Sequence, residues 1–334
     1  MTKPKVAISL VTYNSEKYMP YVLPAIAKQD FTDWQLFILD NESTDGTLAA
    51  IREVAINCKL LEQRHNIGFS RAHNAIINWS DSEYILVLNP DVLLPENYLT
   101  TLVSFMDQHP EVASVSGKLL RWDFANSELT DIVDSYGLEI YKRYHIADRY
   151  QTLPDSETYQ AGQVFGLSAV AVLYRRQALE ATKIPKKNSP DLYEYFDEDL
   201  FAYKEDVDLA WRLRLNGWEH YVLSDIAAYH DRTISNQEKN RQHERRGRKL
   251  INLLSYRNHL AMIKKNSFSS LTWRFFPRML VYEMAKWVYL LFVDGSSITG
   301  LIEYGRLRPK LLYKRKYIRK LISIKPSDFA SWFR

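Results

Sequence analysis

The sequence predicts an α/β fold with a mostly parallel central sheet flanked by helices on both faces. Over the first hundred residues, short apolar runs alternate with stretches of helical periodicity. Polar residues follow three of the runs, as expected where strands end at one edge of a sheet. The 334 residues, 46% apolar and 25% charged, are enough for a full core and typical of a folded protein.

The elements follow in order along the chain. Strands are expected at 6–11, 36–39 and 84–88, with a weaker one at 59–61, and helices at 16–28, 47–56 and 70–79. Residues 121–153 are polar and aromatic without clear periodicity, which indicates a loop-rich insertion, and 164–174 should return to the core. A helix at 205–216, a strand at 221–223, a charged helix at 237–264 and an aromatic-rich segment at 273–293 complete the pattern.

Charge is concentrated at the C-terminus. The net charge is only +4, yet residues 304–327 carry nine basic residues and no acidic one. Cys58 is the only cysteine, so no intramolecular disulfide can form and a reducing compartment is expected. No run of about 18 apolar residues predicts a membrane span, and the first ten residues do not read as a signal peptide.

Polar side chains that follow two of the predicted strands could bind a nucleoside or a metal ion. Asp40, directly after a strand, can accept hydrogen bonds from a ribose or a base, although Ser43 or Asp45 could simply cap the next helix. In Asn89-Pro90-Asp91, Pro90 stops the strand and leaves a carboxylate that can hold a divalent metal. The alternative for both segments is an ordinary polar turn.

Two further segments combine polar groups with helix starts. Residues 66–74 place Arg71 and Asn74 where a phosphate or ribose would be favoured, or where they are only solvated. Residues 197–208 hold six carboxylates, whose mutual repulsion raises the pKa of some and suits one to a general-base role. Singly, each could be a cap or a solvated residue. His230 becomes a metal candidate only if the fold brings it beside Asp91.

In this order, the segments resemble the family 2 glycosyltransferases over residues 5–257, about three quarters of the chain. The resemblance implies the nucleotide-diphospho-sugar transferase fold of GT-A type and an inverting displacement. It rests on Val11-Thr12-Tyr13-Asn14, Asp40-Asn41 with Ser43-Thr44-Asp45-Gly46, residues 66–74, Asn89-Pro90-Asp91, Glu205-Asp206-Val207-Asp208 and His230.

The resemblance also implies roles. Asp206 would be the general base, and Asp91 and His230 would contact Mg²⁺ or Mn²⁺. Asn89 stands where many relatives have Asp, which leaves one carboxylate for the metal. Arg257-Asn258 also resembles a family feature, without an evident physical role. The expected donor-binding residues are Thr12, Tyr13, Asn14, Asp40, Asn41, Asn66, Arg71, Asn74, Asn89 and Asp208.

The expected partners are a nucleoside-diphosphate sugar (rhamnose is one candidate sugar), a glycan or polyprenyl-diphosphate-linked acceptor, and a membrane surface, but no nucleic acid. The overall layout is similar to bacterial rhamnosyltransferase-like members that build cell-surface polysaccharides. We expect a catalytic domain at 1–265 and a helical, basic, membrane-associating region at 266–334, peripheral on the cytoplasmic face of the cell membrane. Aromatic residues that suit an interface are Trp273, Phe275, Phe276, Trp287, Tyr289 and Phe292.

Other readings compete with this one. A nucleotidyltransferase or a metal-dependent hydrolase could use the same carboxylates, but the first strand is followed by Thr12-Tyr13-Asn14-Ser15 and not by a glycine- and lysine-rich phosphate loop. A dinucleotide-dependent oxidoreductase is disfavoured because no Gly-x-Gly-x-x-Gly occurs. A non-catalytic protein that binds a glycan or a nucleotide sugar on the same fold remains the alternative. The packing of the C-terminal region on the catalytic domain is the alternative to membrane association.

Overall fold

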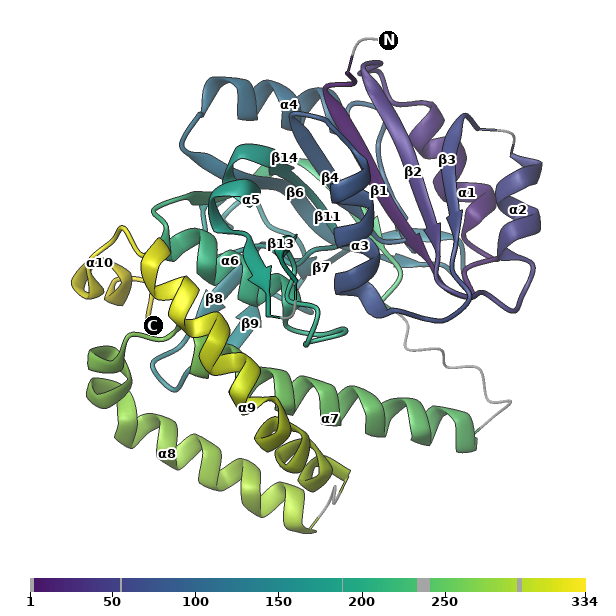
Figure 1. Ribbon diagram of the computed structural model, residues 1–334. Coiled ribbons are helices and arrows are strands. Elements are labelled where there is room, and N and C mark those ends of the chain that lie inside the picture. The colour runs from purple at the N-terminus through teal and green to yellow at the C-terminus, as the bar shows by residue number, and fades with distance from the viewer. Residues whose placement is uncertain (1–2, 55, 188, 233–240, 293–295) are drawn as a thin grey trace.

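The computed structural model describes residues 3–54, 56–187, 189–232, 241–292 and 296–334 (Figure 1). A ten-stranded sheet forms its centre, and two short hairpins lie outside it. The strands are β1 (Val6–Thr12), β2 (Trp34–Asp40), β3 (Cys58–Glu62), β4 (Tyr84–Leu88), β5 (Val92–Leu93), β6 (Val112–Asp123), β7 (Glu128–Ser135), β8 (Leu138–Ile140), β9 (Ile146–Asp148), β10 (Gly162–Gln163), β11 (Ala171–Arg175), β12 (Ile184–Lys186), β13 (Ser189–Glu194) and β14 (Glu219–His230).

The main sheet runs in the order β10-β14-β6-β11-β4-β1-β2-β3, with β5 paired to β14 and β7 to β6. β1 pairs in parallel with β2 and β4, and β2 with β3, so their carboxyl ends share one edge. β6 and β14 are parallel to each other, while β11 runs antiparallel between β4 and β6. The predicted mostly parallel sheet is confirmed, as are its four N-terminal strands.

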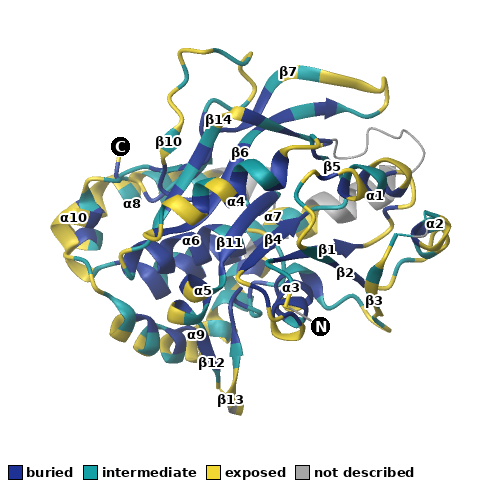
Figure 2. Cartoon of the chain, turned by 90° about the horizontal axis from the view of Figure 1, so that it is seen from above, coloured by how far each residue is buried: buried dark blue, intermediate teal, exposed yellow. Residues whose placement is uncertain are grey.

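Helices cover both faces of this sheet. Alternate strand residues point into two cores: Ile8 and Leu86 pack on one face with α1 and α4, and Ala7 and Val87 on the other with α3, α5 and α6. Figure 2 shows the central strands as buried. The helices are α1 (Met19–Ala27), α2 (Thr47–Glu53), α3 (Gly68–Trp79), α4 (Tyr98–Gln108), α5 (Arg176–Thr182), α6 (Glu205–Leu215), α7 (Arg241–Asn266), α8 (Ser269–Phe292), α9 (Ser296–Leu321) and α10 (Pro326–Ala330).

Two sequence expectations need correction. Residues 121–153 are not a loop-rich insertion, because they contain the end of β6 and the strands β7, β8 and β9. Irregular register in the β6–β7 pair and positive φ angles at Tyr144 and Tyr150 break the alternation that would have indicated strands. The strand expected at 221–223 extends from Glu219 to His230, so His230 ends the strand and does not follow it. Residues 237–240 of the predicted charged helix lie outside the described residues.

The C-terminal helices pack on the sheet domain. α7, α8 and α9 lie at one end of it, with α8 farthest from the sheet (Figure 1). Trp211 of α6 stacks on Phe329 of α10 with ring centroids 5.6 Å apart, and Phe275 of α8 and Phe333 join the same core. The expected boundary between 265 and 266 falls at the end of α7. No helix in the described ranges has the length and apolarity that a bilayer crossing needs.

Candidate active site

Thr12 and Asp40 lie side by side at the carboxyl ends of β1 and β2. The Thr12 hydroxyl donates to Asp40 Oδ1 at 2.8 Å, and Ser43 donates to this carboxylate through its hydroxyl at 2.6 Å and its backbone N–H at 2.9 Å. Asp40 is 1% exposed. These bonds satisfy the buried carboxylate and fix its orientation.

The following turn exposes polar and aromatic groups. Asn14, with φ of 49°, accepts the backbone N–H of Thr44 at 2.8 Å and donates its own N–H to the Ser43 hydroxyl at 2.9 Å. The neighbouring Tyr13 side chain is 50% exposed. A ring held on an ordered turn in this way is available for stacking on a planar ligand.

Asn41 and Asn66 join the end of β2 to the start of α3. The Asn41 amide donates to Asn66 Oδ1 at 3.0 Å and accepts from the backbone N–H of Ile67 at 2.8 Å. Gly68 has φ of +80°, and a Cβ there would meet the Phe201 ring at 2.5 Å. Glycine therefore lets α3 begin against the loop that precedes α6.

His230 lies between Asp91 and Asp134. Its Nδ1 is 2.8 Å from Asp134 Oδ2, and its Nε2 is 3.5 Å from Asp91 Oδ1. Burial alone would lower the pKa of His230, but Asp91 and Asp134 outweigh burial and raise this pKa to about 10. Arg232 contacts the other Asp134 oxygen at 2.7 Å. The fold therefore brings His230 beside Asp91, which was the condition for considering His230 as a metal ligand.

Asp91 and His230 would hold the predicted divalent metal only with His230 neutral, so the cation would take the place of the proton that Asp91 and Asp134 stabilise on the imidazole. Asp91 Oδ1 is buried without a hydrogen-bond partner, and Asp134 holds the opposite nitrogen of the imidazole, as carboxylates do behind metal-binding histidines. In the part of the chain that the structure describes, no three His, Cys, Asp or Glu side chains form a metal-binding group. Two protein ligands suit a cation that takes its other ligands from substrate phosphates and water.

Asp206 lines a cavity of about 390 Å³ together with residues from distant segments. Its Oδ1 accepts the N–H of Val207 at 2.7 Å, and its Oδ2 accepts that of Ala169 at 3.4 Å. The cavity thus joins the start of α6 to the end of β4. The polar residues that line it are Asn89, Asp148, Ser168, Tyr203, Lys204, Glu205, Asp206, Arg232 and Ser255.

The electrostatics of the cavity favour proton acceptance. Burial raises the pKa of Asp206, an effect that Lys204 partly offsets and Asp148 reinforces. Burial and the neighbouring Asp206 raise the pKa of Glu205 to about 8, and Glu205 Oε2 has no hydrogen-bond partner. A carboxylate with a raised pKa is a stronger base than one in water, which suits Asp206 to remove a proton.

The loop before α6 is strained, and α7 holds it in place. Phe201, Tyr203 and Lys204 have φ angles of 65° to 70°, unusual for residues with side chains. The Asn258 amide donates to the carbonyls of residues 200, 202 and 203 at 2.7–2.9 Å, and Arg257 donates to those of residues 199 and 200. This gives Arg257-Asn258 a physical role: it fixes the loop that presents Asp206.

Of the ten predicted donor-binding residues, all of which the structure describes, Asn89 alone lines this cavity. Three of the others, Asn74, Arg71 and Asp208, have partners elsewhere. Asn74 is 1% exposed, and its amide bonds the backbone of residues 195 and 196. Arg71 is paired with Glu198 at 3.5 Å and lines a different cavity. Asp208 is fully buried between Arg212, at 3.2 Å, and Lys265, at 2.8 Å. These contacts give Asn74 and Asp208 structural roles.

Most of the acidic cluster is also structural. Asp197 is fully buried against Lys265 and Lys314, and Asp199 contacts Lys314 at 2.8 Å. Lys314 lies on α9, in the basic segment expected to face lipid. Part of that segment therefore neutralises carboxylates of the sheet domain.

Sequence reasoning missed several cavity residues. Asp148 ends β9, in the segment expected to be a loop-rich insertion, and Ser168 lies in the 164–174 segment expected to return to the core. The Ser168 hydroxyl donates to Asp148 at 2.7 Å. Arg232 follows His230 by two residues and reaches Asp148 at 3.1 Å. The one local signal that could have identified Arg232 as a site residue was its positive charge close to His230 in the sequence.

Comparison with known families identifies the chain. The family model described as "Glycosyl transferase family 2" matches residues 8–181, so Asp206 and His230 lie beyond the matched segment. The poly(ribitol-phosphate) β-N-acetylglucosaminyltransferase TarS of Staphylococcus aureus is 30% identical over 110 residues, which are 31% of this chain but only 19% of that protein. The N-acetylglucosaminyl-diphospho-decaprenol L-rhamnosyltransferase of Mycobacterium tuberculosis is 25% identical over 240 residues, 66% of this chain and 74% of that protein.

Solved structures share the fold. S. aureus TarS residues 1–349 in complex with UDP-GlcNAc superposes with a TM-score of 0.57 at 18% identity, over 95% of this chain and 90% of that one. The mannosyltransferase PcManGT of Pyrobaculum calidifontis, solved with GDP-Man and Mn²⁺, superposes with a TM-score of 0.52 at 16% identity, over 98% of this chain and 83% of that one. The predicted GT-A type fold is therefore confirmed, and the chain belongs to glycosyl transferase family 2.

Proposed function

We propose that the chain is an inverting, metal-assisted glycosyltransferase that moves a sugar from a nucleoside-diphosphate donor to a hydroxyl of a glycan or polyprenyl-diphosphate-linked saccharide in cell-surface polysaccharide synthesis. The observation that carries the proposal is the cavity in which Asp206, with its raised pKa, meets Asn89 from the end of β4. Asn89, at one end of the edge that would hold the donor, thereby shares a space with the proposed base.

The strand edge supplies the donor site. Thr12 and Asp40 would contact the nucleoside, with Tyr13 stacking on the base. Asn14, Asn41 and Asn66 shape the same edge through their hydrogen bonds. Asn89, from the neighbouring strand, would contact the donor where it enters the cavity.

Asp206 would carry the chemistry. It accepts the proton of an acceptor hydroxyl, whose oxygen forms a bond to the anomeric carbon while the bond from that carbon to the diphosphate breaks on the opposite face. Lys204 and Arg232 line the cavity and would stabilise the negative charge of the departing diphosphate. A divalent cation held by Asp91 and His230 would add to that stabilisation.

Substrate and location are inferred from the relatives and from α8. The rhamnosyltransferase named above and the β-1,3-glucosyltransferase WfgD of Escherichia coli, 26% identical over 102 residues, both have polyprenyl-diphosphate acceptors in their names. Rhamnose is the donor sugar to test first, because the rhamnosyltransferase matches 66% of this chain and the glucosyltransferase only 30%. The Trp273 and Trp287 side chains on α8 are 75% and 48% exposed, which supports peripheral contact with the inner face of the cell membrane.

The test compares Asp206→Asn with Asp225→Asn, a change at an exposed carboxylate of β14. We expect Asp206→Asn to lower transfer or donor hydrolysis by about 10²- to 10⁴-fold, with donor affinity nearly unchanged, because the amide cannot accept the proton. Asp225→Asn should match the wild type. EDTA should abolish wild-type turnover and Mn²⁺ should restore it. Donor binding without any turnover in the wild type would favour the non-catalytic alternative.

A further inference from the structure

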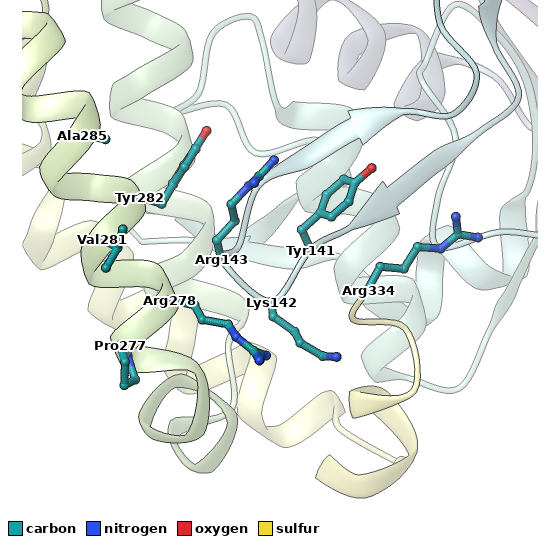
Figure 3. Close-up of a pocket in the computed structure, with 9 residues that line it drawn as sticks. All are labelled: Tyr141, Lys142, Arg143, Pro277, Arg278, Val281, Tyr282, Ala285 and Arg334. Atoms are coloured by element: carbon teal, nitrogen blue, oxygen red, sulfur yellow. The ribbon is translucent and has the colours of Figure 1, made fainter.

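A second, larger cavity lies between α8 and the turn of the β8–β9 hairpin. It has a volume of about 800 Å³ and is lined by residues from the turn, from α8 and from the C-terminus. Figure 3 shows Lys142 of the turn and Arg278 of α8 extending into the same space. We call this cavity the α8 groove. The lining residues used below are Tyr141, Lys142, Arg143, Arg278, Tyr282 and Arg334.

The α8 groove is cationic. Four basic side chains line it, and none of its lining residues is Asp or Glu. Arg334 is paired with Glu139 at 2.7 Å, and Arg143 lies over the Tyr141 and Tyr282 rings at 5.2 and 5.4 Å. Among the described residues, the Lys142 and Arg278 side chains have no ion pair or hydrogen bond. Two uncompensated cations and a third held by aromatic rings favour an anion with several negative oxygens.

The outward face of α8 beside the groove is apolar. Trp273 and Val281 are 75% and 69% exposed, and Met284 and Val288 are 59% and 57% exposed. Arg274 and Arg278 interrupt this face, the pattern of a helix that lies in the plane of a bilayer surface with its cations at headgroup level. The anion in the groove would then belong to a molecule whose tail is in the bilayer.

The β8–β9 hairpin connects the groove to the Asp206 cavity. Its turn lines the groove, while Ile146 and Asp148 of the same hairpin line the cavity. Between the two, His145 lies beside Tyr282 with ring centroids 5.7 Å apart. Burial, and after it the positive charges of Arg143, Lys204 and Lys286, lower the pKa of His145 to about 4, so cations surround this ring.

We propose that the α8 groove binds the diphosphate of a lipid-linked acceptor, so that its sugar extends along the β8–β9 hairpin to Asp206. The proposal rests on the proposed function and adds the place where the acceptor is held. The charge of the groove suits a diphosphate better than a single phosphate, and its volume leaves room for the first sugar. The exposed face of α8 is positioned to contact the bilayer that holds the lipid.

The test is flotation of the full chain with phosphatidylcholine vesicles containing undecaprenyl diphosphate. Parallel vesicles contain undecaprenyl monophosphate, or phosphatidylglycerol at the same total charge. We expect the wild type to bind the diphosphate vesicles most tightly. Lys142→Gln combined with Arg278→Gln should bind them about 10- to 30-fold more weakly, because two cations near a charged surface are lost.

Matched controls make the result decisive. Arg306→Gln combined with Lys316→Gln removes two exposed cations of α9 and should bind as the wild type does. Equal binding to phosphatidylglycerol and diphosphate vesicles, or equal loss in both double variants, would overturn the proposal. Donor hydrolysis measured without acceptor distinguishes failure of the groove assignment from failure of the proposed function. If only the groove assignment is wrong, the hydrolysis rate should be the same in the wild type and in both double variants. If the proposed function is wrong, none of the three proteins should hydrolyse the donor.

Discussion

The two ends of the acidic segment 194–206 have opposite surroundings. At one end, Asp197 and Asp199 are neutralised by lysines of α7 and α9. At the other, Glu205 and Asp206 line a cavity, and burial raises the pKa of both side chains. Carboxylates that are alike in sequence therefore divide into a structural set and a chemical set. What separates them is the supply of cations from the C-terminal helices, which no local pattern reveals.

The largest expected effect is on the structural set. Lys314→Met leaves Glu194, Asp197 and Asp199 without their shared cation in a buried site. We expect the free energy of unfolding to fall by about 3–5 kcal/mol, because an unpaired buried charge is costly. Urea unfolding measures this loss. Lys316→Met, at an exposed position of the same helix, should change the free energy by less than about 0.5 kcal/mol; similar losses in both variants would contradict the division.

A smaller effect, which depends on pH, is expected from the chemical set. The pKa of Glu205 is about 8 in the fold, above its ordinary value of 4.5, so the folded state holds a proton that the unfolded state releases. This contribution to stability is present below the ordinary pKa and is lost as the pH rises through about 8. The Glu205→Gln variant has no ionisable side chain at this position, so its stability lacks this dependence on pH.

Between about pH 6 and pH 8 the stability of Glu205→Gln relative to the wild type should therefore rise by about 2 kcal/mol. Unfolding curves at both pH values measure this difference. A constant difference would mean that Glu205 is ionised in the fold, as an exposed carboxylate would be.

The smallest effect comes from a second cation on Asp199. Lys310 contacts this carboxylate at 2.7 Å, but the lysine side chain is 52% exposed. We expect Lys310→Met to cost no more than about 1 kcal/mol, because solvent screens the pair. Comparison with Lys314→Met in the same unfolding assay tests whether burial, and not ion pairing as such, sets the difference. Equal costs would reject that explanation.

The sequence predicted the local features of the fold better than the long-range ones. The strands ending at Thr12, Asp40 and Leu88 were predictable because apolar runs followed by polar residues mark buried parallel strands. The proximity of Asp91 and His230 could be stated only as a condition for metal binding, because 139 residues separate them in the sequence. The contacts of Asn258 and Lys314 depend on how the C-terminal helices pack on the sheet domain, a tertiary result that single-segment patterns do not contain.

The site was predictable to a similar degree. The strand-end residues were predicted because a parallel sheet gathers its carboxyl ends at one edge, whereas the base role of Asp206 came from the family resemblance. These roles stay predictions. Asp148 was missed because its segment is polar and aromatic without clear periodicity, and Arg232 because no local pattern connects it with Asp148. Asp208 was assigned to the donor because it shares the Asp206 motif; it lies two residues further along α6, and its side chain is fully buried.

The most direct test compares Asp206→Asn with Asp197→Asn for transfer rate at saturating donor and for free energy of unfolding. We predict that Asp206→Asn loses about 10²- to 10⁴-fold in rate and keeps its stability, because only proton acceptance is removed. Asp197→Asn should keep the rate of the folded molecules within a few-fold and lose about 3–5 kcal/mol of stability. Wild-type transfer by Asp206→Asn, with the rate lost in Asp197→Asn instead, would contradict the assignment of the chemistry to Asp206.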